Sequence, residues 1–270
     1  MKNTPIASPL YILREYCAKD LRDVLTRLKA IGFDGVEFLG FFGHTAQEIK
    51  GWLDELDLRA VGDFVSYKEL NENAEAILSD HALLGCGWLS ISDLPMENFA
   101  AVSARLDELA ALAKAKGIRL QYHNHDQELI EKQDGQEVLA YIMDHTVPET
   151  LALEPDLGWI EIGGGDCAEY LRKYAARCEI LHFKDYYATD RSLLGRVREF
   201  VPQRGTPERG CFEFRPTGYG IVDFPALMPL CAACSPRWVV CDDDLAYERD
   251  PFEDLRLSLN YTRALLNIHQ

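Results

Sequence analysis

The sequence lacks the features that would place the protein in a membrane or on nucleic acid. No apolar run reaches the roughly 18 residues that a membrane-spanning helix needs, because charged residues interrupt every candidate. Basic residues are scarce, with 28 Lys and Arg against 44 Asp and Glu and a net charge of −16. Such a chain repels phosphate groups, so we expect neither nucleic acid nor an anionic membrane surface among its partners. The N-terminal segment also lacks the apolar stretch of a signal peptide, and we expect a cytoplasmic protein.

Cysteine and glycine motifs are also sparse. Eight cysteines in 270 residues are too few for a disulfide scaffold, and their mostly apolar neighbours indicate reduced thiols in the core. Cys231 and Cys234 form a CxxC pair, but no second pair follows at zinc spacing, so a place on a helix is favoured over a metal or redox site. No GxGxxG motif follows the first apolar run, and the three glycines at 163–165 indicate a turn. The absence of this glycine motif counts against an open Rossmann-type sheet.

The chain does contain a regular alternation of short apolar runs and longer amphipathic runs. We expect strands at residues 5–10, 35–39, 58–64, 88–91, 118–124, 151–154, 180–183 and 238–241. We expect helices at about residues 18–31, 45–56, 68–84, 97–116, 135–144, 167–176, 222–234 and 251–268. The longest irregular stretch, residues 186–219, contains a small strand at 212–214. Eight such units predict an α/β protein, a single (β/α)₈ TIM barrel over residues 1–270.

Ionisable residues gather where the predicted strands end, which is where barrel enzymes build their active sites. These residues are Glu37, His123, His125, Glu128, Glu154, Asp156, His182, Lys184 and the three acids at 242–244. Residues two apart on a strand share a face, so His123 lies beside His125, Glu154 beside Asp156, and His182 beside Lys184. Imidazole and carboxylate groups from neighbouring strands favour a divalent ion such as Mn, Co, Mg or Zn. The alternative is a set of hydrogen-bonded core side chains, above all for Glu154, which lies one layer deeper than Asp156.

Several segments resemble the xylose isomerase-like barrels known as sugar phosphate isomerases and epimerases. Residues 10–15 read Leu-Tyr-Ile-Leu-Arg-Glu, similar to the family's LYSVRE opening, and residues 122–126 read Tyr-His-Asn-His-Asp, similar to its YHNHDFEF subgroup. Further similar segments lie at 31–38, 156–159, 181–185 and 218–225, in the same order as in the family. The resemblance covers nearly the whole chain. It implies a barrel with a divalent metal held by Glu, Asp, His and Glu from strands five to eight.

The chain departs from that metal set at both glutamates. Asp156 and His182 match the middle two ligands, whereas the first Glu falls on His123 and the last on Cys241. In the better-known epimerases these glutamates are also the acid and the base. Three alternatives follow: Asp242 or Asp243 takes the last place, Cys241 binds metal as a thiolate, or the site has lost its metal or its activity.

The residues and the resemblance together predict an enzyme that moves a proton next to a carbonyl group through an enediolate, as a sugar or sugar phosphate isomerase or epimerase. The expected metal ligands are His123, Asp156 and His182. The expected catalytic residues are Glu154, His125 and Lys184. The expected substrate-binding residues are Glu37, Glu128 and Arg215.

Other functions fit the same residues. A dehydratase or lyase acting on a keto-sugar or inosose would use the same site, and a carbohydrate-binding barrel without turnover would explain Cys241. A metal nuclease on this fold would need a basic groove, which the net charge of −16 excludes. We expect a small carbohydrate as the ligand. We also expect a homodimer, in which the final helix and the segment after strand seven cover a neighbouring copy.

Overall fold

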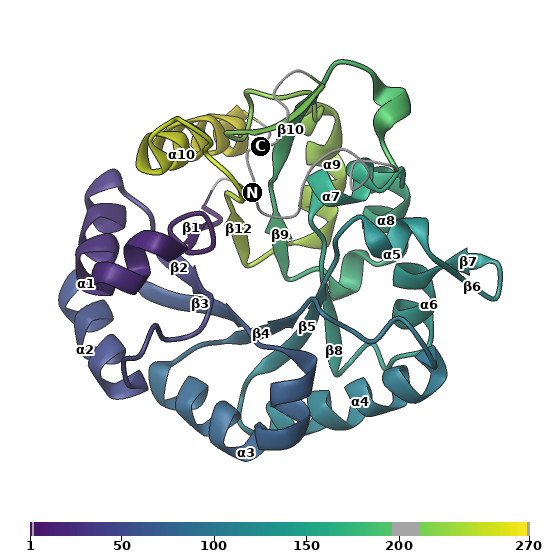
Figure 1. Ribbon diagram of the computed structural model, residues 1–270, viewed down its shortest axis with the longest axis horizontal. Coiled ribbons are helices and arrows are strands. Elements are labelled where there is room, and N and C mark those ends of the chain that lie inside the picture. The colour runs from purple at the N-terminus through teal and green to yellow at the C-terminus, as the bar shows by residue number, and fades with distance from the viewer. Residues whose placement is uncertain (2, 196–210, 269–270) are drawn as a thin grey trace.

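The centre of the computed structural model, which describes residues 1, 3–195 and 211–268, is a barrel of eight parallel strands (Figure 1). The strands run around the barrel in the order β8-β5-β4-β3-β2-β1-β12-β9. They are β1 (Ile6–Pro9), β2 (Gly35–Phe38), β3 (Arg59–Phe64), β4 (Trp88–Ile91), β5 (Arg119–His123), β8 (Leu151–Glu154), β9 (Ile180–His182) and β12 (Trp238–Val240). The predicted TIM barrel is confirmed, and the open-sheet alternative is wrong.

The barrel closes between β8 and β9 through a single parallel bridge, which pairs Asp156 with His182. Pro155 precedes this bridge and has no N–H, but its carbonyl accepts a hydrogen bond of 3.0 Å from the N–H of His182. At this seam β8 and β9 therefore meet without a regular ladder of strand pairs. Two of the predicted metal ligands lie on it.

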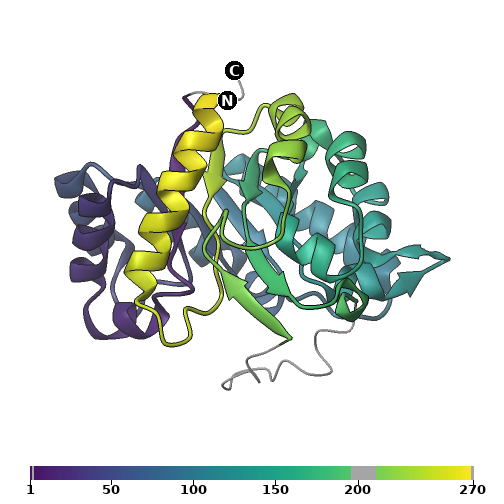
Figure 2. The same ribbon diagram turned by 90° about the horizontal axis from the view of Figure 1, so that it is seen from above.

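Helices surround the barrel and antiparallel hairpins extend from it (Figures 1 and 2). The helices are α1 (Arg14–Ile31), α2 (Ala46–Leu56), α3 (Tyr67–Leu84), α4 (Phe99–Ala115), α5 (Gln127–Ile130), α6 (Val138–Asp144), α7 (Leu157–Ile162), α8 (Cys167–Lys173), α9 (Phe224–Cys234) and α10 (Pro251–Ile268). The hairpins pair β6 (Lys132–Gln133) with β7 (Gln136–Glu137), and β10 (Asp185–Ala188) with β11 (Phe212–Arg215). Short 3₁₀ turns lie at Ala175–Arg177 and Arg191–Leu193.

The local signals in the sequence explain most helix ends. Thr45 caps α2 through a reciprocal capping box with Glu48, and Gly32 ends α1 in the left-handed conformation. Helix α1 begins four residues before the predicted start and is broken at Asp20, whose φ of −157° and ψ of 90° are not helical. Helix α7 was not predicted, because six residues are too short to show a helical repeat.

The hairpin β10–β11 lies within the stretch that was predicted to be irregular. The expected strand at 212–214 is confirmed as part of β11, and β10 is its unexpected partner. Residues 196–210 of that stretch lie outside the described residues. In the view of Figure 2 this hairpin extends beyond one end of the barrel.

The barrel interior changes character along its axis. Ile180 and Trp238, at the amino ends of β9 and β12, join Ala7, Val61 and Val240 in a separate apolar cluster. The next layer towards the carboxyl ends is polar, where the Gln121 amide donates hydrogen bonds to Ser90 and Glu154. Buried polar groups therefore accumulate at one end only.

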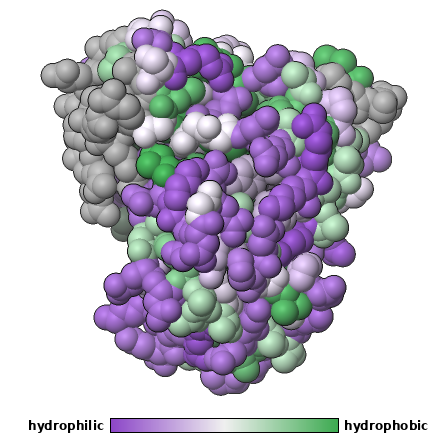
Figure 3. All heavy atoms as spheres, turned by 90° about the vertical axis from the view of Figure 1, so that its right-hand side faces the viewer, coloured by the Kyte–Doolittle hydropathy of each residue, from purple (hydrophilic) through white to green (hydrophobic). Residues whose placement is uncertain are grey.

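The face of the protein shown in Figure 3 is mostly polar. The face that includes α6 and α8 is largely hydrophilic, with small scattered apolar areas (Figure 3). Among the described helices, none combines the length and apolar character needed to cross a bilayer.

Candidate metal centre

Four side chains from four positions around the rim converge at the carboxyl end of the barrel. His123 ends β5, Asp156 follows β8, His182 ends β9 and Asp242 follows β12, and all four are buried. Each offers one ligand atom within 4.8 Å of the others. We call these four residues the rim group. The structure thus brings together all three predicted metal ligands, His123, Asp156 and His182.

A second group lies next to the first and shares His182 with it. The Nε2 atom of His182 lies 3.1 Å from Glu37 Oε2 and 3.3 Å from Glu154 Oε1. Glu154 Oε2 also lies 3.3 Å from His123 Nδ1. Glu154 therefore lies between two imidazoles, and it belongs to both a structural network and the candidate site.

Burial and neighbouring charges push the pKa values of these groups in opposite directions. Burial and the charge of Glu154 raise the pKa of Glu37 to about 8, and burial raises the pKa of Asp156 to about 7. Burial disfavours the Glu154 carboxylate too, but His182 and His123 outweigh it and lower its pKa below the ordinary value. Burial lowers the pKa of His123, whereas Glu37 and Glu154 overcome burial and raise that of His182. Acids and bases of distinct strength thus stand side by side.

The last acid of the rim group is Asp242, and the neighbouring Cys241 points away from the group. The Cys241 thiol donates to Thr262 Oγ1 on α10 at 3.4 Å, away from the rim group. Burial raises the pKa of this thiol to about 12, so it stays protonated. Asp243 accepts a hydrogen bond from the N–H of Leu245 and belongs to neither group. Of the alternatives at the end of β12, the geometry supports Asp242.

Lys184 is fully buried among three carboxylates. Its Nζ atom donates to Asp242 Oδ2 at 2.6 Å and to Asp244 Oδ1 at 2.7 Å, and lies 3.3 Å from Asp156 Oδ2. Burial alone would lower the pKa of Lys184, but these three charges outweigh burial and raise it well above its ordinary value. The ammonium group is therefore charged at neutral pH. Asp244 is one of the acids noted after the last predicted strand, but no role was predicted for it.

The Tyr-His-Asn-His-Asp segment is explained by contacts within the rim. The Asn124 amide accepts a hydrogen bond from Asp156 N–H at 3.1 Å and donates one to the Asp156 carbonyl, so it extends the pairing of β5 with β8. Glu128 accepts hydrogen bonds from Tyr122 Oη at 2.7 Å and from His125 N–H at 2.9 Å. The His125 ring lies against His123, with ring centres 5.3 Å apart. Burial lowers its pKa to about 4, so it is neutral at pH 7.

Aromatic side chains that the sequence interpretation did not select surround the rim group. The Phe64 ring at the end of β3 lies 5.0 Å from the His123 ring, and Trp159 on α7 lies 5.4 Å from His125. Phe214 on β11 lies 5.5 Å from Trp159. Arg215, the predicted substrate-binding residue next to Phe214, donates to Glu213 at 2.7 Å and belongs to neither group. Three aromatic rings thus border the site.

Two glycines allow the close packing around Lys184 and Asp185. A Cβ atom on Gly158 would lie 2.6 Å from the Lys184 carbonyl oxygen, so only glycine lets α7 approach the segment between β9 and β10 this closely. Asp185 accepts hydrogen bonds of 2.9–3.1 Å from four backbone N–H groups, those of Tyr186, Gly218, Gly220 and Val222. A Cβ atom on Gly220 would lie 2.2 Å from Asp185 Oδ1. These contacts explain the Gly-Tyr-Gly motif at 218–220.

The donor atoms of the two groups fit a divalent metal ion. Among the described residues, Glu37 Oε1 is buried without a hydrogen-bond partner, and Glu37 Oε2, Asp156 Oδ2 and His182 Nε2 have charged neighbours at 3.1–3.3 Å but no well-formed hydrogen bond. Buried polar atoms in native proteins are nearly always satisfied, and a bound ion can satisfy several at once. Mixed imidazole and carboxylate donors suit Zn, Mn or Co. His123, Asp156, His182 and Asp242 are the residues that would hold the ion.

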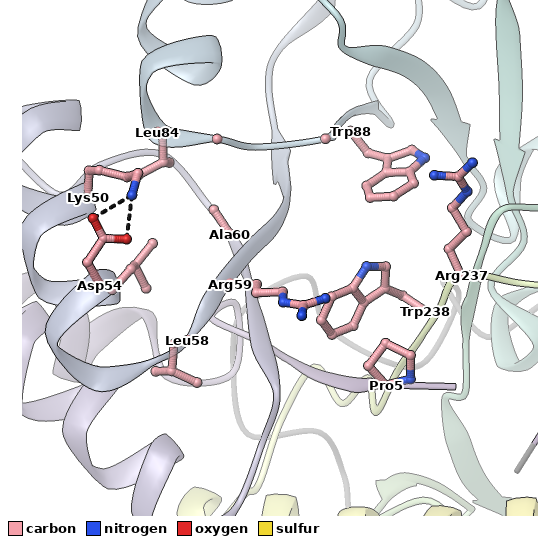
Figure 4. Close-up of a pocket in the computed structure, with 13 residues that line it drawn as sticks. Pro5, Lys50, Asp54, Leu58, Arg59, Ala60, Leu84, Trp88, Arg237 and Trp238 are labelled. Atoms are coloured by element: carbon pink, nitrogen blue, oxygen red, sulfur yellow. Dashed lines mark hydrogen bonds and ion pairs between the residues drawn. The ribbon is translucent and has the colours of Figure 1, made fainter. Parts of the chain in front are cut away.

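A pocket at the opposite end of the barrel has different chemistry. It has a volume of about 710 Å³ and lies at the start of β3, β4 and β12. Trp88 and Trp238 line it beside the guanidinium groups of Arg237 and Arg59, and Lys50 pairs with Asp54 at its edge (Figure 4). None of these residues belongs to either ligand group. Active sites of TIM barrels lie at the other end, so this pocket is not the candidate site.

Known proteins resemble the chain over its whole fold and, locally, in sequence. A 34% identical stretch of 89 residues matches an inosose dehydratase of Clostridium perfringens and spans 33% of this chain and 29% of that relative's length. A sugar phosphate isomerase/epimerase from Parabacteroides distasonis superposes with a TM-score of 0.73 at 20% identity, covering 97% of this chain and 94% of the other. The IOLI protein, whose crystal structure holds a zinc atom, gives a TM-score of 0.72 at 12% identity and covers 98% of this chain and 99% of the other. At these identities the two structures demonstrate a shared fold.

The family assignment rests on a match to most of the barrel. The model of the xylose isomerase-like TIM barrel family matches residues 25–243, which include every strand from β2 to β12 and the whole rim group. This confirms the resemblance that the motifs indicated, and the chain belongs to the xylose isomerase-like TIM barrel family.

Proposed function

We propose that this protein is a metal-dependent enzyme that moves a proton next to the carbonyl group of a small carbohydrate, as a sugar isomerase or epimerase. The observation that carries the proposal is the buried rim group, in which two imidazoles and two carboxylates lie within 4.8 Å of one another. Such a cluster is costly to bury unless a ligand or ion compensates it. Its place at the carboxyl end of the strands is the place of catalysis in TIM barrels.

The metal would supply Lewis acidity: it would polarise the carbonyl oxygen of a carbohydrate and stabilise the negative charge that develops there. The protein must then supply a proton acceptor. His125 is only partly buried and neutral at pH 7, so its ring can accept a proton from a ligand at the rim. Burial lowers its pKa to about 4, which makes it a weaker base than a free imidazole. Glu154 is fully buried between His123 and His182, which favours a role in orienting both rings. We therefore favour His125 as the base and keep Glu154 as the alternative.

The remaining predicted residues differ in whether their polar atoms already have hydrogen-bond partners. Glu37 Oε2 lies 3.1 Å from His182 Nε2, whereas Glu37 Oε1 has no hydrogen-bond partner among the described residues and is available for a substrate hydroxyl. Both oxygens of Glu128 are engaged by Tyr122 and His125, which favours a role in positioning His125. Lys184 is a protonated group in direct contact with Asp156 and Asp242, and it stays the predicted proton donor. The rings of Trp159 and Phe214 would provide apolar surfaces for the C–H groups of a sugar ring.

A dehydratase acting on a keto-polyol is the second candidate. The specific support is the local 34% identity with an inosose dehydratase. Dehydration begins with the same removal of a proton next to a carbonyl, and differs in the subsequent loss of a hydroxyl group. The homodimer and the cytoplasmic location expected from the sequence stay predictions.

Proton exchange with solvent tests the proposal directly. Purified protein loaded with Mn²⁺ is incubated in D₂O with unphosphorylated and phosphorylated ketoses and with keto-polyols, and deuterium at carbon is measured by NMR. We expect exchange next to a carbonyl with at least one class, and loss of a hydroxyl if the dehydratase proposal is correct. Asp156→Asn is the matched control, because the amide can still accept the 2.9 Å hydrogen bond from Trp159 N–H that caps α7. A protein that binds sugars equally well with and without metal, and never exchanges a proton, would instead be a binding barrel.

A further inference from the structure

The position of Lys184 has a consequence for metal binding. Two of its three carboxylate partners, Asp156 and Asp242, belong to the rim group. The third, Asp244, does not, and its side chain is 19% exposed whereas that of Lys184 is 1% exposed. A buried cation thus already lies against half of the candidate ligands.

A divalent ion and this ammonium group compete for the same oxygens. Carboxylate oxygens approach zinc to about 2.0–2.2 Å, and the Asp242 oxygen that contacts Lys184 also lies 3.0 Å from His182 Nδ1. An ion at the rim group would therefore lie close to the ammonium nitrogen. Repulsion between like charges is strong in a buried site, because the effective dielectric constant there is low.

The ammonium group has one partner that a metal at the rim group would leave unused. Asp244 Oδ1 accepts from Lys184 Nζ at 2.7 Å and lies outside both ligand groups. A shift of the lysine towards Asp244 would free Asp156 and Asp242 while keeping one ion pair. Among the described residues, no other carboxylate oxygen lies within 4.0 Å of this nitrogen.

We propose that Lys184 is an internal counter-cation that competes with the divalent ion for Asp156 and Asp242 and shifts to Asp244 when the ion binds. The inference rests on the metal-dependent function proposed above. It assigns Lys184 a role that is separate from proton donation. Removing its charge makes the empty site less stable and the metal site tighter.

Calorimetric titration of the metal-free full-length protein with Mn²⁺ alone tests this role. Lys184→Met removes the charge at similar length, and we expect Mn²⁺ to bind at least about tenfold more tightly than to wild type. Lys184→Arg keeps the charge and should stay within about threefold of wild type. Asp244→Asn removes the alternative partner, so Mn²⁺ should bind more weakly. Lys50→Met, at the other end of the barrel, should leave the affinity unchanged.

The outcomes separate this inference from the proposed function. Wild type that binds Mn²⁺ while Lys184→Met binds it no more tightly overturns the inference and makes Lys184 a positioning residue for Asp242. If no variant binds Mn²⁺ or Zn²⁺, both the metal-dependent function and this inference are wrong. Should Lys184→Met fail to fold without metal, Asp244→Asn decides: tighter or unchanged binding in that variant overturns the inference. Thermal melts with and without Mn²⁺ check folding, and we expect the larger metal-induced rise in Tm for Lys184→Met.

Discussion

The two ends of the barrel bury opposite kinds of side chain. The amino end is filled by the apolar cluster of Ala7, Val61, Ile180, Trp238 and Val240. The carboxyl end buries the rim group with Lys184 and Glu37. Buried charges seldom stabilise a fold more than well-packed hydrocarbon does, and a charge without its partner is costly. The comparison therefore favours the amino end as the more stable part and the carboxyl end as the place of the proposed function.

The largest expected effect is on stability at the amino end. Ile180 is fully buried and lies on the same strand as His182, two residues earlier. Ile180→Ala should lower the free energy of unfolding by about 2–5 kcal/mol, because it leaves a cavity. Urea denaturation measures this loss. Mn²⁺ affinity of the folded variant should stay near that of wild type, and a large loss of affinity would show that the two ends are not separable.

The next effect is the loss of metal binding at the carboxyl end. His182 is the one side chain shared by both ligand groups. His182→Ala should lower Mn²⁺ affinity by more than the 10- to 100-fold typical of removing an outer partner of a ligand. Calorimetry measures the affinity, with Ile180→Ala as the control on the same strand. Retention of wild-type affinity would exclude the rim group as the metal site.

A smaller effect concerns pH and the pair of Asp63 and His81 beside the barrel. His81 Nε2 lies 2.7 Å from Asp63, and its Nδ1 lies 2.7 Å from the Ile77 carbonyl. Burial alone would lower the pKa of His81, but its bond to Asp63 and the charge of Asp63 outweigh burial and raise it. The raised value means that this stabilisation is complete below the unfolded pKa of about 6.5 and is lost as pH rises through the folded pKa.

Denaturation curves from pH 5.5 to 9 test this sign. The difference in unfolding free energy between wild type and His81→Gln should be largest at the acidic end and shrink with rising pH. A difference that grows with pH would contradict a charged His81. Asp63 also accepts a 2.7 Å hydrogen bond from Gly40 N–H, so the pair supports the loop after β2.

The smallest expected effect is at Cys241. Its thiol points to Thr262, so Cys241→Ser should change Mn²⁺ affinity by less than about twofold, as expected for an inert buried cysteine. Asp242→Asn is the companion variant and should weaken binding clearly. The reverse ranking would restore Cys241 as the ligand.

The sequence predicted the barrel and most of the site because both depend on short repeats. Strand ends and alternation grouped His123, Asp156 and His182, and the structure brings these three residues together, while their role as metal ligands stays a prediction. The same rules could not decide among residues 241, 242 and 243, because the run Cys-Asp-Asp-Asp offers a possible ligand at every position. That choice depends on register: Val240 pairs with His182, so Asp242 follows on the inner face.

Contacts between distant loops were beyond such rules. The meeting of Lys184 with Asp244 joins residues sixty positions apart, and neither has a repeat that indicates the other. Trp159 lies on a helix of six residues, which is too short to recognise from periodicity. The sequence shows that both family glutamates are replaced, but only the structure shows that Asp242 lies in the rim group whereas Cys241 contacts Thr262.

The four hydrogen bonds to Asp185 restrict how this region can vary during evolution or redesign. A surface turn usually tolerates insertion, because its backbone is bonded to water. In the turn at 218–222 three amides instead depend on one carboxylate of β10. A change in the length of this turn would leave the buried Asp185 carboxylate, next to Lys184, without these hydrogen-bond donors. Grafting this turn onto a related barrel therefore requires transplanting Asp185 with it.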